Sequence, residues 1–219
     1  SMSSRCVKID GLTLATGNAK LGRVMNISLP PPVSCDTSMP CFVSGQCYAM
    51  RHCYRLYGNV RESWNGNWNT WLDRGPAGYF GAIRKAIALK RPRMFRWHVG
   101  GDIPESGGDL GGAYIGGMCS VADAFPDTAF WCFTKRYGFI RANSTMIRGT
   151  PNLNVVLSAW PGVRLDGRTR LRWPVCWVRD PLHRDFRIPK NAHPCAGDCE
   201  KCQVCAFLKP GESIVIRKH

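Results

Sequence analysis

The chain has 219 residues, of which 44% are hydrophobic and 11% aromatic, so it can form one domain with a sizeable core, or one domain plus a small appendage. Its 30 Lys and Arg residues outnumber its 15 Asp and Glu residues and give a formal net charge of +15. No charged head followed by an apolar run opens the chain, and its apolar stretches are far too short to span a bilayer. From these features we expect no secretory signal and no membrane span, and a soluble cytosolic protein.

The first part of the chain predicts a loop followed by helices. Residues 11–46 are rich in Gly, Pro and Ser, which indicates an irregular, ligand-bearing loop. Residues 47–61 and 79–90 predict helices, the second with an apolar and a basic face. Between them, three tryptophans recur at helical spacing: Trp64, Trp68 and Trp71. This stripe predicts core packing, with a base-stacking platform as the alternative.

The middle of the chain predicts buried strands that alternate with helices. Apolar, aromatic or β-branched runs indicate strands at residues 94–99, 128–134, 152–158 and 173–179. Helical spacing indicates helices at residues 113–125 and 139–147. This alternation implies βαβ units, so we expect an α/β protein with a mostly parallel sheet, favouring an incomplete (βα) barrel. The expected division is an α/β domain over residues 1–190 and a cysteine-rich, metal-pinned extension over residues 191–219.

Cysteine is unusually frequent in this chain. The twelve cysteines are Cys6, Cys35, Cys41, Cys47, Cys53, Cys119, Cys132, Cys176, Cys195, Cys199, Cys202 and Cys205. Without a signal peptide, this number argues for metal or redox chemistry and against a disulfide framework. Eight of them gather in two groups, at residues 35–53 and 195–205. The others are scattered among apolar residues, where a free cysteine is usually a small hydrophobe.

The C-terminal group carries the strongest motif, Cys195-x3-Cys199-x2-Cys202-x2-Cys205. Four thiolates this close in sequence converge on one site if the backbone wraps around it. Such a ligand set serves a [4Fe–4S] cluster or a structural zinc ion. Tight runs are more typical of clusters, because zinc sites usually split into two well-separated pairs. We therefore expect a metal site here and favour a cluster over zinc.

The N-terminal group is evenly spaced, with Cys35, Cys41 and Cys47 followed by Cys53. Three thiolates would leave one iron of a [4Fe–4S] cluster open to another ligand, whereas four would close it. We predict a second cluster on the first three cysteines and leave the role of Cys53 open. The alternative is a single shared site, in which these cysteines complete the coordination of the C-terminal group.

Four polar residues follow or end predicted strands. His98 and Asp102 flank the end of the first, and Lys135 and Ser158 end two others. Ligands of open α/β sheets bind beyond the carboxyl ends of the strands, so these residues are catalytic candidates. A plain structural role is the alternative for each, and for His98 it is that of a core histidine with a satisfied hydrogen bond.

Basic residues form two clusters that lack acidic neighbours. The first contains Arg84, Lys85, Lys90, Arg91, Arg93 and Arg96, and the second Arg164, Arg168, Arg170 and Arg172. Such a field favours nucleic acid or a phosphate-bearing ligand, because neutralised phosphates release counterions. A solvated basic face without a partner is the alternative.

An ordered set of short runs resembles the bacteriophage gene product 88 family. The runs are Gly17-Asn18-Ala19-Lys20, Ser28-Leu29-Pro30, Cys47-Tyr48-Ala49, Arg96 to Asp102, Phe130 to Lys135, and Cys199-x2-Cys202-x2-Cys205. They cover nearly the whole chain. The resemblance implies a phage protein that acts in the cytoplasm of a bacterial host.

The run Gly100-Gly101-Asp102-Ile103-Pro104 is more distantly similar to the Gly-Gly-Glu-Pro element of radical S-adenosylmethionine enzymes, which holds the amino group of the cofactor. The resemblance implies that Gly100, Gly101 and Asp102 meet the methionine end of S-adenosylmethionine. It also implies that the three N-terminal cysteines, Cys35, Cys41 and Cys47, hold the open-site cluster. Their x5 and x5 spacing departs from the x3 and x2 spacing usual in those enzymes.

Three functions remain open from the sequence. The first is a phage iron–sulfur protein of radical-enzyme-like architecture, with one or two [4Fe–4S] clusters, that acts on nucleic acid or a nucleotide. The second is a non-enzymatic basic module that is stabilised by an iron–sulfur cluster or zinc and binds host nucleic acid or a host protein. The third is a redox-sensing regulator whose partner binding changes when its cluster is lost.

Overall fold

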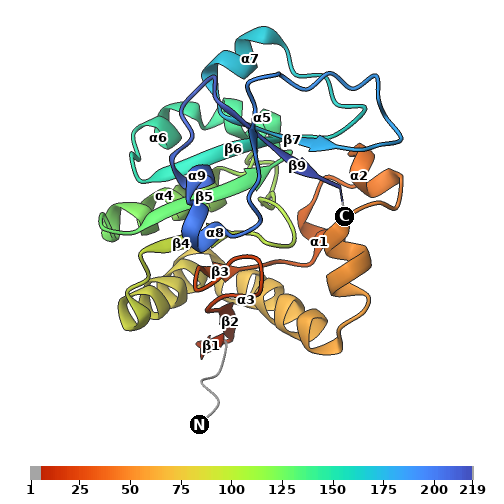
Figure 1. Ribbon diagram of the computed structural model, residues 1–219. Helices are drawn as coiled ribbons and strands as arrows, with labels where there is room; N and C mark the ends of the chain where they lie inside the picture. The colour runs from red at the N-terminus through yellow and green to blue at the C-terminus, as the bar shows by residue number, and fades with distance from the viewer. Residues whose placement is uncertain (1–5, 219) are drawn as a thin grey trace.

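Short apolar runs build a nine-stranded open sheet in the computed structural model, which describes residues 6–218 (Figure 1). The strands are β1 (Cys6–Ile9), β2 (Leu12–Ala15), β3 (Met25–Ile27), β4 (Met94–Trp97), β5 (Ala129–Thr134), β6 (Leu153–Ala159), β7 (Val175–Arg179), β8 (His193–Pro194) and β9 (Ser213–Arg217). Their order is β1-β2-β3-β4-β5-β6-β7-β9-β8. The pairs β1–β2 and β2–β3 are antiparallel and the rest parallel. The predicted α/β fold with a mostly parallel sheet is confirmed.

Helices connect the parallel strands. From β3 to β7 the strands are adjacent in chain order, and right-handed crossovers place the connecting helices on one face. These helices are α3 (Gly58–Lys90), α4 (Gly112–Ala124), α5 (Tyr137–Ala142), α6 (Ser144–Arg148) and α7 (Gly167–Arg172). The sheet is open. The expectation that it forms an incomplete (βα) barrel stays a prediction.

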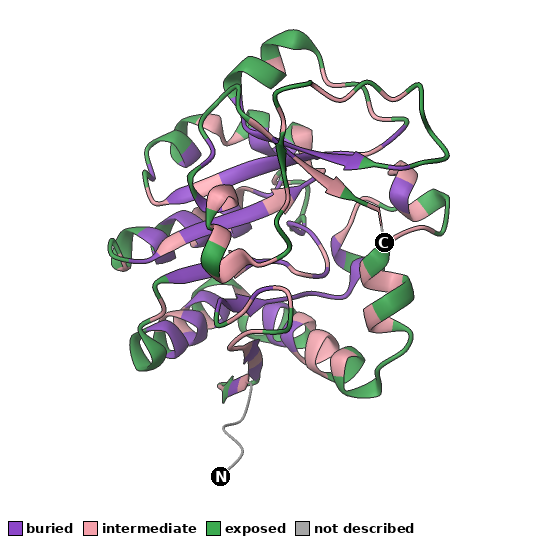
Figure 2. Cartoon of the chain, viewed as in Figure 1, coloured by how far each residue is buried: buried purple, intermediate pink, exposed green. Residues whose placement is uncertain are grey.

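The two faces of the sheet differ in chemistry because successive side chains of a strand alternate. The helix-covered face is apolar, and Phe95 of β4 and Phe130 of β5 pack there beneath α3 and α4. Figure 2 shows the central strands mostly buried. The opposite face presents Arg96, Trp131 and Asn154, which are register partners on β4, β5 and β6. The short helices α8 (Cys199–Cys202) and α9 (Val204–Phe207) lie over this second face (Figure 1).

The irregular loop predicted for residues 11–46 is wrong in part. It contains β2, β3 and two single-turn helices, α1 (Pro31–Ser34) and α2 (Pro40–Val43). The short strands depend on Asn67 of α3, whose Oδ1 accepts from the Thr13 N–H at 2.7 Å. Its Nδ2 donates to the carbonyls of Thr13 at 3.0 Å and Ser28 at 2.9 Å. A contact so distant in sequence leaves no local signal.

The helix predicted for residues 47–61 is also wrong in part. A π-helical turn, η1 (Ala49–Tyr54), is followed by the 33-residue α3, which begins only at Gly58. A kink interrupts α3 at Gly75, where φ is +60°, just before Pro76. The predicted core role of the tryptophan stripe is confirmed for Trp71, which is 4% exposed and packs edge-on against Tyr79.

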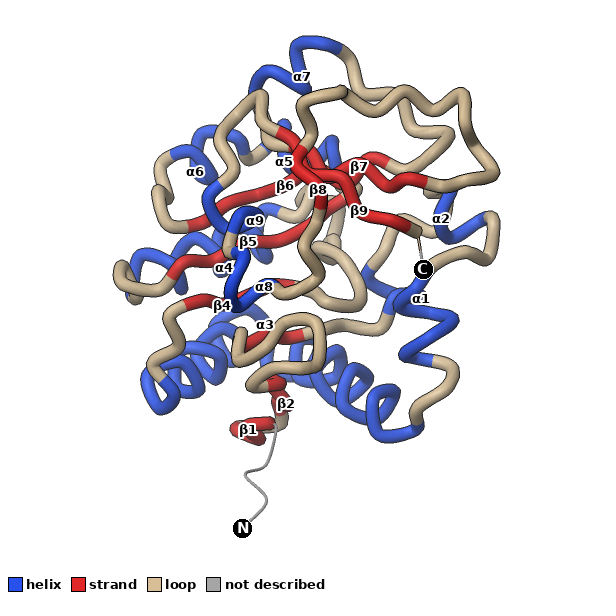
Figure 3. Tube along the Cα trace, in the orientation of Figure 1, coloured by secondary structure: helices blue, strands red, loops and turns tan. Residues whose placement is uncertain are grey.

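The remaining central elements follow the prediction closely. The helix predicted at residues 113–125 is α4, and the one predicted at 139–147 divides into α5 and α6. After β7, residues 180–192 form a long connection to β8 (Figure 3), and β9 then enters the sheet between β7 and β8. Among the described residues, no helix is long and apolar enough to cross a membrane.

Candidate metal centres

The four C-terminal cysteines line one small pocket on the second face of the sheet, beside Trp131. Cys195 follows β8, and its N–H donates to the Val215 carbonyl of β9 at 2.9 Å. Cys199 and Cys202 begin and end α8, and Cys205 lies in α9. Gln203 separates these two turns in a left-handed conformation, with φ at +56°. The wrapping that the cysteine spacing requires is therefore present.

Contacts with distant segments hold the C-terminal cysteines in place. The Nδ2 of Asn154 on β6 donates to the carbonyls of Cys205 at 2.9 Å and Leu208 at 3.0 Å. The Cys199 N–H donates to the Lys20 carbonyl at 3.0 Å. These bonds tie Cys205 to the sheet and Cys199 to the N-terminal loop.

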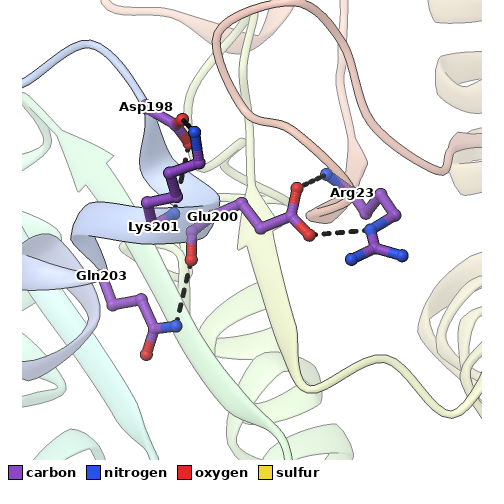
Figure 4. A network of polar contacts seen from close by, with 5 residues as sticks. All are labelled: Arg23, Asp198, Glu200, Lys201 and Gln203. Atoms are coloured by element: carbon purple, nitrogen blue, oxygen red, sulfur yellow. Dashed lines mark hydrogen bonds and ion pairs between the residues drawn. The ribbon is translucent and has the colours of Figure 1, made fainter.

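Glu200 adds a second tie between the two ends of the chain (Figure 4). Its carboxylate accepts from the Arg23 N–H at 3.0 Å and from Arg23 Nε at 2.7 Å. A side chain at Gly22, where φ is +65°, would overlap Glu200. Asp198 caps α8 by accepting from the Lys201 N–H at 3.2 Å. Because the Arg23 side chain is 91% exposed, solvent screens this ion pair, and it adds little to stability.

Trp131 lines the cysteine pocket, and the charge of Arg96 interacts with two of its thiols. Arg96 Nε and Trp131 Nε1 are buried, and neither has a hydrogen-bond partner among the described residues. The Arg96 guanidinium lies over the Phe133 ring, 4.9 Å from its centroid. Burial lowers the pKa of Arg96, and the thiols of Cys199 and Cys205 oppose that shift. Within the part of the chain that the structure describes, Arg96 forms no ion pair.

This donor set fits an anionic metal–thiolate group. A buried cation without a counter-ion is costly, and four ionised thiols would supply the missing negative charge. Burial raises the pKa of Cys199 and Cys205, whereas a bound metal ionises the thiols that coordinate it. Among the described residues, no three His, Cys, Asp or Glu side chains stand in an arrangement that would hold a metal ion.

The three predicted N-terminal ligands gather around Lys135 at the carboxyl edge of the sheet. Burial opposes the charge of Lys135, but Cys41, Asp102, Cys35 and Cys47 together raise its pKa above the ordinary value. Burial raises the pKa of Cys35 and Cys41. The structure thus brings these cysteines together with two of the four catalytic candidates.

Cys53 lies at the margin of this group. Burial raises the pKa of its thiol, which has a side-chain hydrogen bond with Tyr48 and an electrostatic interaction with Cys47. Whether it is a ligand stays open.

Asp102 is the best-connected polar residue of the N-terminal site. Its Oδ1 accepts from Thr134 Oγ1 at 2.6 Å and from the Ile103 N–H at 2.8 Å, and its Oδ2 accepts from the Lys135 N–H at 2.9 Å. The Asp102 N–H donates to Ser34 Oγ at 3.2 Å. Asp102 therefore links the end of β5 to the segment that leads into Cys35.

The two glycines before Asp102 are required by close packing. Gly101 has φ at +84°, and a Cβ there would lie 2.5 Å from the Leu29 carbonyl oxygen. A Cβ at Gly100 would overlap the Trp64 ring. The Leu29 N–H also donates to the Gly100 carbonyl at 3.0 Å. Their role in binding S-adenosylmethionine remains a prediction.

The other two catalytic candidates make different contacts. His98 is 3% exposed and bonds through Nε2 to the Tyr114 hydroxyl of α4 at 2.8 Å, within the helix-covered core. Its backbone is left-handed, with φ at +55°, a strained conformation for a non-glycine residue. Ser158 is buried on β6 opposite Cys176 of β7, and its carbonyl accepts from the Tyr137 hydroxyl.

His98 should make stability depend on pH. Burial, assisted by the charge of Arg96, lowers the His98 pKa to about 3, so below about pH 6.5 the unfolded chain binds a proton that the folded chain excludes. Stability is therefore lost as pH falls from about 6.5 towards 3, and the unfolding free energy should be about 1 kcal/mol lower at about pH 5.5 than at about pH 7. Denaturant titrations should show this loss in the wild type and a smaller one in His98→Asn. Equal pH dependence in both would contradict it.

Members of the two predicted basic clusters have different surroundings. Lys85 pairs with Asp10 at 2.6 Å, and Arg84 donates to Ser120. Arg96 faces the thiols, whereas Arg168 and Arg170 are exposed on α7.

Sequence reasoning missed Arg96 as a site residue, along with Trp131 and Asn154. The available signal was a charged residue within an aromatic strand, Met94-Phe95-Arg96-Trp97, since a strand buried on both faces is expected to be apolar throughout.

Residues 10–210 match the model of the family described as Gene product 88, and the chain belongs to this family. The resemblance to that bacteriophage family is thereby confirmed. No curated protein and no solved structure shows a significant match. The more distant similarity to radical S-adenosylmethionine enzymes stays a prediction.

Proposed function

We propose that this gene product 88 family member is an iron–sulfur protein that acts on nucleic acid or a nucleotide. One [4Fe–4S] cluster would be held by Cys195, Cys199, Cys202 and Cys205, and a second by Cys35, Cys41 and Cys47. The observation that carries the proposal is the C-terminal pocket. Four thiols and the Trp131 indole line this pocket, and the charge of Arg96 interacts with Cys199 and Cys205. The buried Arg96 Nε and Trp131 Nε1 have no hydrogen-bond partner among the described residues.

At the C-terminal site, the protein would hold the cluster and shield it from water. Arg96 and Trp131 would donate to sulfur and balance negative charge, and both are fixed by adjacent strands. Leu21, Val24 and Ala206 form an apolar wall that limits water. When bound, such a cluster supplies one-electron chemistry, with a potential set by hydrogen bonds, charge and exposure.

At the N-terminal site, three cysteines leave room for a further ligand at the sheet edge where α/β proteins bind substrates. Lys135 offsets negative charge there. Asp102 Oδ2 accepts one bond from the protein, so a lone pair remains for an ammonium group. We assign the amino group of S-adenosylmethionine to that position, on the resemblance to radical S-adenosylmethionine enzymes.

A metal-stapled binding module is the second candidate. The contacts of Glu200 and Asn154 favour it, because they use the C-terminal segment to tie the N-terminal loop to the sheet. In that case the metal would stabilise the folded state, and a zinc ion could take the place of a cluster.

Anaerobic purification followed by metal and sulfide analysis tests the proposal. We expect a brown protein with about eight iron and eight sulfide atoms per chain, and binding of S-adenosylmethionine. About one or two zinc ions without sulfide would favour the binding module. A folded, colourless, metal-free protein would contradict both.

A further inference from the structure

A second pocket lies beside the C-terminal cysteines. Its volume is about 700 Å³, and its lining includes Lys20 of the N-terminal loop, Arg179 of β7 and Arg217 of β9. This volume falls within the range of small-molecule sites. Cys195 and Gly197 line both this pocket and the four-cysteine pocket, so the two share a wall. We call this second hollow the basic pocket.

The two arginines of the basic pocket are direct neighbours. Arg179 and Arg217 are register partners on the parallel strands β7 and β9, whose backbones lie about 4.8 Å apart. Like charges placed opposite one another destabilise a sheet. Both side chains belong to exposed residues, and neither forms an ion pair within residues 6–218.

The carboxylate next in sequence does not neutralise them. Asp180 is buried, and its Oδ2 is held by Lys218 Nζ at 2.7 Å and by His183 Nδ1 at 3.0 Å. The described lining of the basic pocket contains no acidic residue. The two arginines therefore have no acidic partner in the lining, and their charges lie side by side on one wall.

The lining also has an apolar part, formed by Val215, Ile216 and Pro194. One guanidinium group can bind two phosphate oxygens at once, and a lysine ammonium adds a point charge. An apolar wall suits a sugar or base. The combination matches a ligand with phosphate at one end and a ring system at the other.

We propose that the basic pocket binds the phosphate of a nucleotide, either free or within a nucleic-acid strand, through Arg179, Arg217 and Lys20. This site deepens the proposed function, on which it rests for the identity of the neighbouring metal group. The bound phosphate would lie beside Cys195, so a nucleotide substrate would be anchored next to the C-terminal site.

Binding of two probes tests the site. One probe is ATP, and the other is a short fluorescent single-stranded DNA. The test variant combines Arg179→Gln and Arg217→Gln, and the control combines Arg61→Gln and Arg141→Gln, which remove the same charge from exposed positions of α3 and α5. Both should keep the wild-type melting temperature, because all four residues are exposed.

In the test variant, affinity for at least one probe should fall about tenfold or more. For the DNA probe, the dependence of log affinity on log salt should weaken by about 0.7 for each phosphate that the variant no longer neutralises. The control should stay close to the wild type. Tight ATP binding identifies a free nucleotide, and salt-sensitive DNA binding identifies a strand.

Three results would overturn the site: no binding of either probe, unchanged binding in the test variant, or an equal fall in affinity in the control. Iron and sulfide are measured on the same samples. Arginine-dependent binding by a protein that lacks iron would refute the proposed metal chemistry and leave the phosphate site standing.

Discussion

Replacing Cys199 with Ser is expected to lower the iron content from about eight to about four atoms per chain. The variant removes a thiolate from a site where four line one pocket, and a hydroxyl is a much poorer ligand for iron–sulfur clusters. The three cysteines around Lys135 lie at the carboxyl edge of the sheet and do not line this pocket, so their cluster should persist. Iron and sulfide analysis with electron paramagnetic resonance of the reduced protein would show one remaining signal.

Two further variants make this result interpretable. Cys41→Ser should produce the reciprocal loss and retain the C-terminal signal. Cys6→Ser changes a cysteine of the edge strand β1 and should keep full iron content. If Cys199→Ser and Cys41→Ser each abolished all iron, the two groups would form a single shared site. Unchanged iron in Cys199→Ser would refute the C-terminal site.

The central strands could be predicted because their signal is local. Residues 128–134 and 152–158 are continuous apolar or aromatic runs between turn residues, and they form β5 and β6. The strands β2 and β3 have only four and three residues, and a contact with Asn67, far away in α3, holds them. Such tertiary stabilisation cannot be read from a short window of sequence.

At the candidate sites too, local features could be predicted from the sequence and long-range contacts could not. Spacing was enough to group Cys195 with Cys199, Cys202 and Cys205, because short intervals limit where the thiols can go. It could not show that Arg96 faces them, since that depends on which face of β4 the C-terminal segment covers. Likewise, the pairing of Arg179 with Arg217 is a property of strand register, and β9 was not among the predicted strands.

The charge of Arg96 should set the potential of the C-terminal cluster. Two unit charges about 6 Å apart in an effective dielectric of about 20 interact by about 3 kcal/mol, which equals about 120 mV for a one-electron couple. Reduction adds negative charge, which the guanidinium stabilises. Arg96→Gln should therefore lower the reduction potential by about 100 mV, as measured by electrochemical titration with absorption or resonance detection.

Trp131→Phe separates the effect of hydrogen bonding on the reduction potential from the effect of charge. It removes the indole N–H that lacks a partner among the described residues and keeps a ring at the same place, so the potential should fall by a smaller amount than in Arg96→Gln. Arg93→Gln is the matched control, because Arg93 is an exposed arginine just before β4. It should leave the potential within the error of the wild type, since solvent screens an exposed charge. Equal potentials in Arg96→Gln and Arg93→Gln would mean that Arg96 does not face the cluster, and the buried guanidinium would then need another anion.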